Sequence, residues 1–234
     1  MKKLIFTITT LLLFTTSSFA QEICESFTLL RNGTHLEYTD YDKKGKAISK
    51  SSHTTSQVMN EGQKIVAKIK IESSDLKKKS TTFSSEYDIS CQNGVLSIDM
   101  QRFFDNNQLS QFSDSKFDVE ISGDALDFPA DGKSGDILNN GNLTIKVSTD
   151  GVAIITTTMN ISNRTIGGTE SITTDAGTFD CKVISYDFDT KAGFIKVKGS
   201  AKQWFTTDQV MVKSESYSKN GKLLSTSKLT NYKK

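Results

Sequence analysis

The chain has 234 residues, of which 35% are hydrophobic, and it carries 29 lysines and arginines against 27 aspartates and glutamates. The lysines alternate with acids and hydroxyl residues, so the composition offers no clustered basic charge of the kind that binds nucleic acid or anionic lipid. We therefore expect no nucleic-acid partner. After the first twenty residues no stretch reaches the about 18 apolar residues of a membrane-spanning helix, so no transmembrane anchor is expected.

The first twenty residues have the pattern of a cleavable signal peptide. Lys2 and Lys3 give a positive start, 4–14 is an apolar run, and Ser18-Phe19-Ala20 is a small-x-small cleavage site. We expect cleavage near Ala20-Gln21 and export to the periplasm or the extracellular space. Because the formal net charge of +2 includes Lys2 and Lys3, the mature chain is formally neutral.

The mature chain, residues 21–234, is long enough for a single β-rich domain with a substantial core. Cys24 lies near its start, where a lipid-modified cysteine would be found in a lipoprotein. Ile23 before it is bulky, whereas a lipobox requires a small residue at that place. We therefore do not expect Cys24 to carry a lipid.

Alternation of apolar and polar residues predicts strands along most of the chain. It is clearest at 64–71, where one face holds Ile65, Ala67, Ile69 and Ile71. The segment 83–91 alternates too, and Asn93-Gly94 turns the chain into 95–98. Further strands are expected at 34–42, 46–58, 116–122, 142–149, 152–163, 166–174, 178–188, 194–205, 209–218 and 223–231. Roughly a dozen strands with short turns predict an all-β antiparallel meander that forms a strongly curved sheet or open barrel.

Two distant segments share the pattern Tyr-x-Lys-x-Gly-Lys, at 41–46 and at 217–222. Each lies between predicted strands, and Gly45 and Gly221 can supply the positive φ that a tight turn needs. Both copies are therefore predicted to be hairpin tips. Internal duplication and independent use of the same turn chemistry both explain the similarity.

The segment 99–113 breaks the alternation. Met100, Phe103 and Phe104 have helical spacing, whereas Leu109 and Phe112 fall on another side of a straight helix. This pattern predicts a short helix followed by a break. Its apolar side chains would either plug the end of the barrel, which is the favoured interpretation, or form a lid over a hydrophobic pocket.

Three cysteines remain after maturation. In an oxidising compartment two of them are expected to form a disulfide, and three pairings can be drawn. We favour Cys24 with Cys91, because this bridge would tie the start of the mature chain to the body of the domain. Cys181 lies on the apolar side of a predicted strand and is expected to be a free, buried thiol.

No catalytic or cofactor-binding motif is present. The chain lacks a Gly-x-Ser-x-Gly nucleophile elbow, and Gly132-Lys133-Ser134 lacks the first glycine of a phosphate-binding loop. His35 and His53 have no metal-ligand spacing and are both expected to face solvent from strands. The sequence thus predicts a non-enzymatic protein with no cofactor and no metal.

Aromatic residues are the remaining resource for binding. Trp204 is the single tryptophan, and its alternating surroundings favour packing in the core or the barrel wall over a ligand platform. If a hydrophobic pocket exists, its candidate residues are the apolar residues of the segment 99–113 and this tryptophan: Met100, Phe103, Phe104, Leu109, Phe112 and Trp204.

Several motifs resemble those of the TapB-like group, secreted domain-of-unknown-function proteins of Gram-negative bacteria. The chain shares an Ala-Gly-Thr-Phe-Asp-Cys turn and strand at 176–181, Lys-Gln-Trp-Phe at 202–205, and Met-Val-Lys-Ser-Glu at 211–215. The opening 36–46 and the Cys-x-Asn-Gly segment at 91–94 also match. The family usually has glycine before the methionine, whereas Val210 precedes Met211 here, which puts the tightness of that turn in doubt.

This resemblance implies a single antiparallel β domain, distantly like periplasmic lipoprotein carriers, and carries over no site residues. Our leading hypothesis is an exported protein that binds a lipid-like or other hydrophobic small molecule. The alternative is a structural or interaction module of the cell envelope with a fully packed core and no small-molecule ligand. A ligand site would require several hundred Å³ of open space, so the volume of any cavity separates the two.

Overall fold

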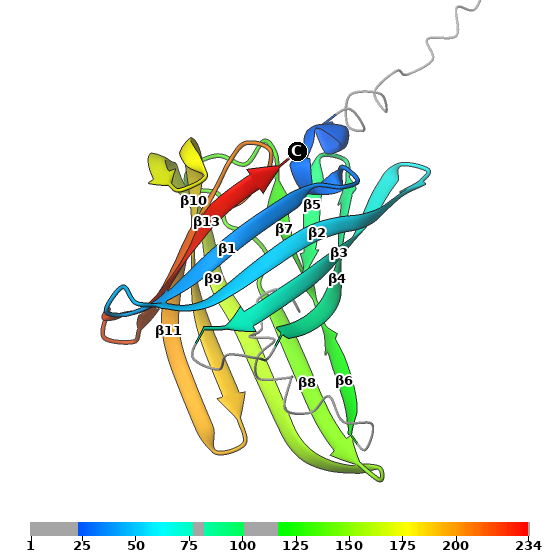
Figure 1. Cartoon of the computed structure of the whole chain (residues 1–234), viewed down its shortest axis with the longest axis vertical. Helices are drawn as coiled ribbons and strands as arrows, with labels where there is room; N and C mark the ends of the chain where they lie inside the picture. Colours follow the sequence, from blue (N-terminus) through cyan, green and yellow to red (C-terminus); the bar gives the residue numbers. More distant parts are fainter. Residues whose placement is uncertain (1–22, 77–81, 101–116, 234) are drawn as a thin grey trace, which may run out of the picture.

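The structure is a computed structural model that describes residues 23–76, 82–100 and 117–233. In these ranges it has a short 3₁₀ helix, η1 (Thr28–Leu30), and thirteen strands. The strands are β1 (His35–Asp42), β2 (Ala47–Glu61), β3 (Lys64–Asp75), β4 (Thr82–Gln92), β5 (Val95–Asp99), β6 (Asp118–Gly123), β7 (Ala125–Pro129), β8 (Gly141–Thr149), β9 (Val152–Thr174), β10 (Gly177–Ala192), β11 (Ile195–Phe205), β12 (Met211–Ser218) and β13 (Leu223–Lys233). They form one antiparallel sheet that curls into a nearly closed barrel (Figure 1).

The sheet is a meander in which the first and the last strand, β1 and β13, pair with each other in the centre. Its strand order is β6-β8-β9-β10-β11-β12-β13-β1-β2-β3-β4-β5-β7. Consecutive strands form hairpins from β8 to β13 and from β1 to β5, and β13 pairs with β1. The predicted all-β class, antiparallel meander and curved sheet are confirmed.

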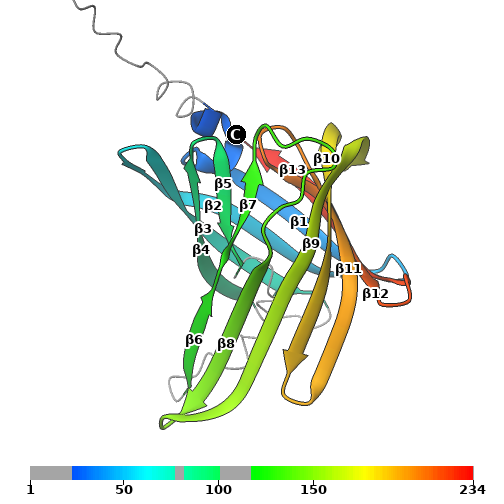
Figure 2. The same ribbon diagram turned by 180° about the vertical axis from the view of Figure 1, so that it is seen from behind.

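The two edge strands of the sheet, β6 and β7, are consecutive in the chain. These strands follow one another with only Asp124 between them, yet β6 pairs with β8 and β7 pairs with β5 (Figure 2). The switch of partner is local: the Asp124 amide donates to the Asn142 carbonyl at 2.9 Å. Gly123 permits this approach, since a Cβ there would lie only 2.4 Å from the same oxygen. One continuous segment therefore connects the two margins of the sheet.

Two details of the strand prediction were wrong. The segments 152–163 and 166–174 are one strand, β9, because Asn163 adopts a positive φ of 54° and bends the strand without ending it. The short apolar run that ends at Pro129 is strand β7, which was not predicted as a strand. Pro129 lies at the end of this strand on the margin of the sheet, where a missing N–H is tolerated.

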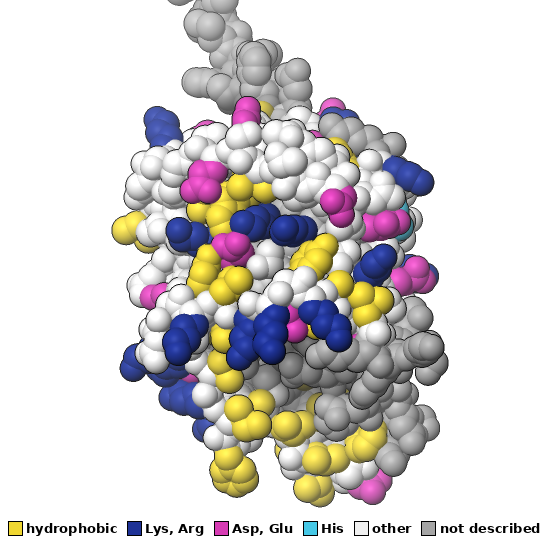
Figure 3. All heavy atoms as spheres, turned by 60° about the vertical axis from the view of Figure 1, so that its left-hand side comes forward, with side chains coloured by type: hydrophobic (Ala, Val, Ile, Leu, Met, Phe, Trp, Pro, Cys, Tyr) yellow, Lys and Arg dark blue, Asp and Glu magenta, His cyan; other side chains and the backbone are white. Residues whose placement is uncertain are grey.

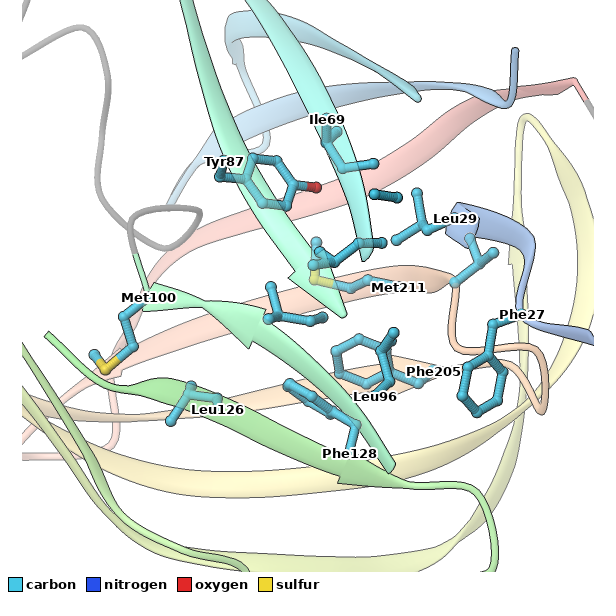
Figure 4. Close-up of a cluster of buried hydrophobic side chains, with 14 of the residues drawn as sticks. Phe27, Leu29, Ile69, Tyr87, Leu96, Met100, Leu126, Phe128, Phe205 and Met211 are labelled. Atoms are coloured by element: carbon cyan, nitrogen blue, oxygen red, sulfur yellow. The ribbon is translucent and has the colours of Figure 1, made fainter. Parts of the chain in front are cut away.

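The hydrophobic core lies inside the barrel. The predicted apolar face of β3 points inward, with Ala67 and Ile69 fully buried. Leucines and phenylalanines of β5, β7 and β11 pack against it, and η1 adds side chains from the end of the barrel (Figure 4). The labelled members of this cluster are Phe27, Leu29, Ile69, Tyr87, Leu96, Met100, Leu126, Phe128, Phe205 and Met211.

A disulfide joins Cys24 to Cys91, the pairing favoured from the sequence, with a Cα–Cα distance of 5.6 Å. Both cysteines are buried, so the bridge anchors the segment before η1 onto β4. The bonded Sγ of Cys24 is not available for a thioether to lipid. Cys181 is free and buried, and its burial raises the pKa of the thiol to about 12.

A buried arginine stabilises the junction between β7 and β9. Arg164 is 1% exposed and donates from its two terminal nitrogens to the carbonyls of Asn139 and Asp127, both at 2.9 Å. Its guanidinium carbon lies 4.9 Å from the centre of the Phe128 ring. Burial lowers the pKa of Arg164 to about 10, so the group remains charged at neutral pH. The two hydrogen bonds therefore link the 130–140 loop and β7 to β9.

The two Tyr-x-Lys-x-Gly-Lys segments are hairpin tips, as predicted, and they lie side by side (Figures 1 and 2). In one tip the Gly45 amide donates to the Asp42 carbonyl at 2.9 Å, and in the other the Gly221 amide donates to the Ser218 carbonyl at 2.8 Å. The two glycines have φ angles of 76° and 72°. The sequence echo thus corresponds to one turn geometry used twice.

Replacing Gly221 with valine should lower the free energy of unfolding by about 1–2 kcal/mol, because a β-branched residue is strained at this positive φ. No neighbouring atom lies within 4 Å of the added Cβ, so the loss would measure backbone strain alone. Urea denaturation monitored by tryptophan fluorescence would detect it. Gly168→Val is the matched control, since Gly168 also has open space around it but lies in a strand without positive φ. Equal stability of the two variants would contradict the strain argument.

Candidate binding cavity

The barrel contains a partly open cavity of about 410 Å³. Strands β1, β2, β3 and β9 to β13 supply its walls. This volume is within the roughly 300–1,000 Å³ range of small-molecule sites. The cavity exists because the inward positions of several strands carry small polar residues where the core elsewhere carries leucine or isoleucine.

One wall of the cavity is rich in hydroxyl groups. Cross-strand pairing places the inward residues Ser214, Ser227, Asp40 and Ser49 in one continuous row across β12, β13, β1 and β2. A parallel row pairs Ser216 with Ser225, whose hydroxyl oxygens lie 2.7 Å apart. The serines that line the cavity are Ser49, Ser51, Ser73, Ser214, Ser216, Ser225 and Ser227. A wall of this kind can donate to and accept from a ligand at many points.

Two residues of this wall are a carboxylate, Asp40, and a buried serine, Ser73, without a hydrogen-bond partner among the described residues. The Ser49 hydroxyl donates to Asp40 Oδ2 at 2.7 Å, which orients the carboxylate beside the cavity. Ser73 is 7% exposed, and its hydroxyl has no hydrogen-bond partner within the described part of the chain. Leaving such a buried hydroxyl unpaired costs about 1–3 kcal/mol.

An aromatic cluster forms another part of the lining. His53 is 6% exposed and lies between Tyr38 and Tyr87, with ring centres 5.1 and 5.9 Å away. Its Nδ1 lies 3.3 Å from Tyr87 Oη, while the Tyr38 hydroxyl donates to the Met211 carbonyl at 2.9 Å. The expectation that His53 faces solvent was wrong, because the inward face of β2 is polar and this histidine belongs to it. His35, by contrast, is partly exposed.

The facing wall of the cavity is apolar. Met159 and Ile161 of β9 and Phe188 of β10 line it, while Ile48, Ile71 and Met211 add apolar surface from β2, β3 and β12, which also carry serines of the hydroxyl wall. Hydroxyl groups on one side and hydrocarbon on the other match a molecule that has both a hydrogen-bonding part and an apolar part. A purely hydrocarbon ligand would displace water from the hydroxyl wall without offering it any hydrogen bond, which costs free energy of desolvation.

The pocket residues predicted from the sequence do not form this cavity where they can be placed. Met100 is fully buried in the core, and Trp204 packs with Cys181, Val183 and Val212 in a separate cluster. Gln203 lines the cavity, so the next residue, Trp204, points to the outer face of β11, where its indole N–H donates to Glu170 Oε2 at 2.8 Å. Phe103, Phe104, Leu109 and Phe112 lie outside the described residues, as does the predicted signal peptide.

Sequence reasoning missed the cavity because it searched for aromatic and apolar side chains. The available signal was serine at every second position of a strand, as in Ser49 and Ser51, Ser214 and Ser216, or Ser225 and Ser227. Such spacing keeps hydroxyl groups on one face of a strand. When that face points into a barrel, the small serine side chains fill less of the interior than leucine or isoleucine would, and a cavity remains.

Other site types find no support in the described part of the chain. No three His, Cys, Asp or Glu side chains there gather in the arrangement of a metal site. None of the helices described there has the length and hydrophobicity of a transmembrane helix.

A family model described as DUF3108-like matches residues 31–229, which include β1 to β12 and most of β13. The chain belongs to the DUF3108-like family. The comparison with curated proteins found no match.

Two solved structures share the fold of this DUF3108-like chain. One is a candidate exported protein with a YmcC-like fold from Bacteroides fragilis, with a TM-score of 0.75, 20% identity, and coverage of 89% of this chain and 99% of that chain. The other is a candidate lipoprotein from Parabacteroides distasonis, with a TM-score of 0.73, 22% identity, and coverage of 88% and 99%. At these identities the similarity shows a common fold.

Proposed function

We propose that this DUF3108-like protein is an exported, non-enzymatic binding protein that holds one small amphipathic molecule inside its barrel. Export is supported by the signal-peptide pattern of residues 1–20 and by the descriptions of the two structural relatives as an exported protein and a lipoprotein. The motifs at 176–181 and 202–205 support placing it in the TapB-like group.

The observation that carries the proposal is the pairing of a hydroxyl wall with an apolar wall across a cavity of about 410 Å³. A sheet that served only as a packed scaffold would fill its interior with close-packed side chains. Here a space of about 410 Å³ stays open between the strands, and serines of β2, β3, β12 and β13 line it. An acyl chain against Met159, Ile161 and Phe188, with its polar end toward the serines, would satisfy both walls.

The cavity lining favours binding over catalysis. Catalysis by acyl transfer needs a nucleophile, a base and a group that orients the base. His53 is the histidine of the lining, and it packs edge-on between two tyrosines, 3.3 Å from Tyr87 Oη and 3.5 Å from Ser51 Oγ. The Ser51 distance is at the limit for a hydrogen bond.

The cavity can be tested by filling it. Ala201 lines it and is 4% exposed, so Ala201→Phe should occupy the space and weaken binding of the fluorescent fatty acid dansylaminoundecanoic acid at least about tenfold. Lys202→Phe is the matched control, because the neighbouring side chain is exposed on the outer face of the same strand. Fluorescence titration gives the affinities, and circular dichroism checks that both variants fold.

Native mass spectrometry of protein purified from its own host would complement this titration. We expect a retained mass in the lipid range that is absent from Ala201→Phe. If wild-type protein retains no mass and takes up no probe, the packed structural module becomes the better account.

A further inference from the structure

Two hairpin tips at one end of the barrel expose large apolar side chains. On the β10–β11 tip Phe194 is fully exposed, and Ile195 is 68% exposed. On the β8–β9 tip Val152 and Ile154 are 67% and 51% exposed. Both hairpins project from the same end of the molecule, where hydrophobic side chains gather on the surface (Figures 1 and 3). Clusters of this kind on a soluble surface mark sites that bind a membrane or another protein.

The β10–β11 tip also concentrates positive charge. Lys191 and Lys196 are directly opposite each other in the pairing of the two strands, and like charges in that position destabilise a hairpin. Asp189 is the one acid of the segment 189–198, and its Oδ2 lies 2.6 Å from the Nζ of a third lysine, Lys198, and 3.9 Å from the Nζ of Lys196. The tip therefore has a local excess of positive charge that the neutral net charge of the mature chain conceals.

The spacing of these residues suits the surface of a bilayer. Phe194 occupies the turn itself, and the lysines are set back from it along the strands. An aromatic ring can enter the interface between headgroups and acyl chains while flanking lysines extend their ammonium groups to lipid phosphates. Two separate projecting tips fit a fluid surface, whereas protein interfaces need one patch with close shape complementarity.

We propose that the β8–β9 and β10–β11 tips dock the protein reversibly on an anionic lipid bilayer. Phe194 and Ile195 insert from one hairpin and Val152 from the other, while Lys191 and Lys196 bind anionic headgroups. This docking is independent of any ligand in the barrel, so it can fail or succeed separately from the proposed binding function.

Co-sedimentation with vesicles tests the docking. Wild-type protein should bind vesicles that contain phosphatidylglycerol and should bind pure phosphatidylcholine vesicles much more weakly, with affinity falling as salt rises. Phe194→Ala should weaken binding about tenfold through lost apolar burial. Lys191→Glu combined with Lys196→Glu should weaken it at least about twentyfold, since each lysine near an anionic surface contributes about a factor of five.

Matched controls separate the tips from general surface effects. Ile137 is 82% exposed in the 130–140 loop, and Ile137→Ala should leave vesicle binding unchanged. Lys43→Glu combined with Lys44→Glu makes the same change of net charge at the β1–β2 tip and should have a small effect. If the tip variants bind vesicles as the wild type does, or if the controls lose binding equally, the proposal is wrong.

A fluorescence measurement tests directly whether the β10–β11 tip enters the bilayer. The emission of Phe194→Trp should shift to shorter wavelength with anionic vesicles and be quenched by brominated acyl chains, whereas Trp204 is buried and should not respond. If light scattering instead shows a dimer that Phe194→Ala converts to a monomer, without vesicle binding, the tips hold a second copy of the chain and the membrane proposal falls.

Discussion

Replacing Phe128 with alanine should lower the free energy of unfolding by about 3–5 kcal/mol, the usual cost of truncating a buried phenylalanine. Phe128 is 1% exposed, its ring centre lies 5.0 Å from that of Phe205, and it pairs with Leu96 across β7 and β5. The ring also supports the buried guanidinium of Arg164 at 4.9 Å. The cavity left by alanine would therefore lie at the junction that holds the two margins of the sheet together.

Chemical denaturation measures this loss, and Phe194→Ala is the control for it. The same atoms are removed there from a fully exposed ring, so stability should change by less than about 0.5 kcal/mol. The contrast between the two phenylalanines tests the placement of the core. A small cost for Phe128→Ala would show that the β5–β7 margin is not closely packed.

Removing the disulfide should have a comparable effect. The double variant Cys24→Ser with Cys91→Ser opens a bridge between residues 67 positions apart, and the loop-entropy relation assigns such a bridge about 4 kcal/mol. Both sulfurs are buried, so the serine hydroxyls add a further desolvation cost. Thermal melts of the double variant should show a large decrease in Tm.

Reduction of wild-type protein provides an independent check on the disulfide. Protein unfolded and refolded with reductant should melt near the double variant, because both lack the same covalent link. Cys181 is buried with a raised pKa and should remain unlabelled by thiol reagents in the native state. A reduced protein as stable as the oxidised one would show that the bridge contributes little.

Much of the fold could be predicted from the sequence because the decisive signals are local. Strict alternation at 64–71 specified the buried face of β3, and Asn93-Gly94 specified a tight turn. Gly45 and Gly221 marked two hairpin tips through the positive φ that glycine tolerates. These features depend on residues within a few positions of one another, so no knowledge of distant partners was needed.

The cavity and the closure of the barrel could not be predicted, because both depend on which strands become neighbours. A serine on a strand looks like a solvent-facing residue until β12, β13, β1 and β2 are placed side by side and their inward rows align. The Arg164 side chain likewise finds its acceptors in Asn139 and Asp127, which are far from it in sequence. The direction of Trp204 could not be predicted either, because alternation along β11 does not show which of its two faces lies inside the barrel. In the structure Trp204 packs on the outer face with Cys181, Val183 and Val212.

The pairing of β1 with β13 makes the order of chain synthesis matter for folding. His35 to Asp42 leave the ribosome early, yet their partner is Leu223 to Lys233, so the hydrogen-bonding edge of β1 is exposed until almost all of the described chain has been made. Contacts of such long sequence separation form slowly, and an open strand edge is prone to aggregate. A chain shortened before β13 would leave two adjacent edges unpaired, on β1 and on β12, in the centre of the sheet. A chaperone that kept the chain unfolded until β13 is available would therefore protect it from aggregation through these edges.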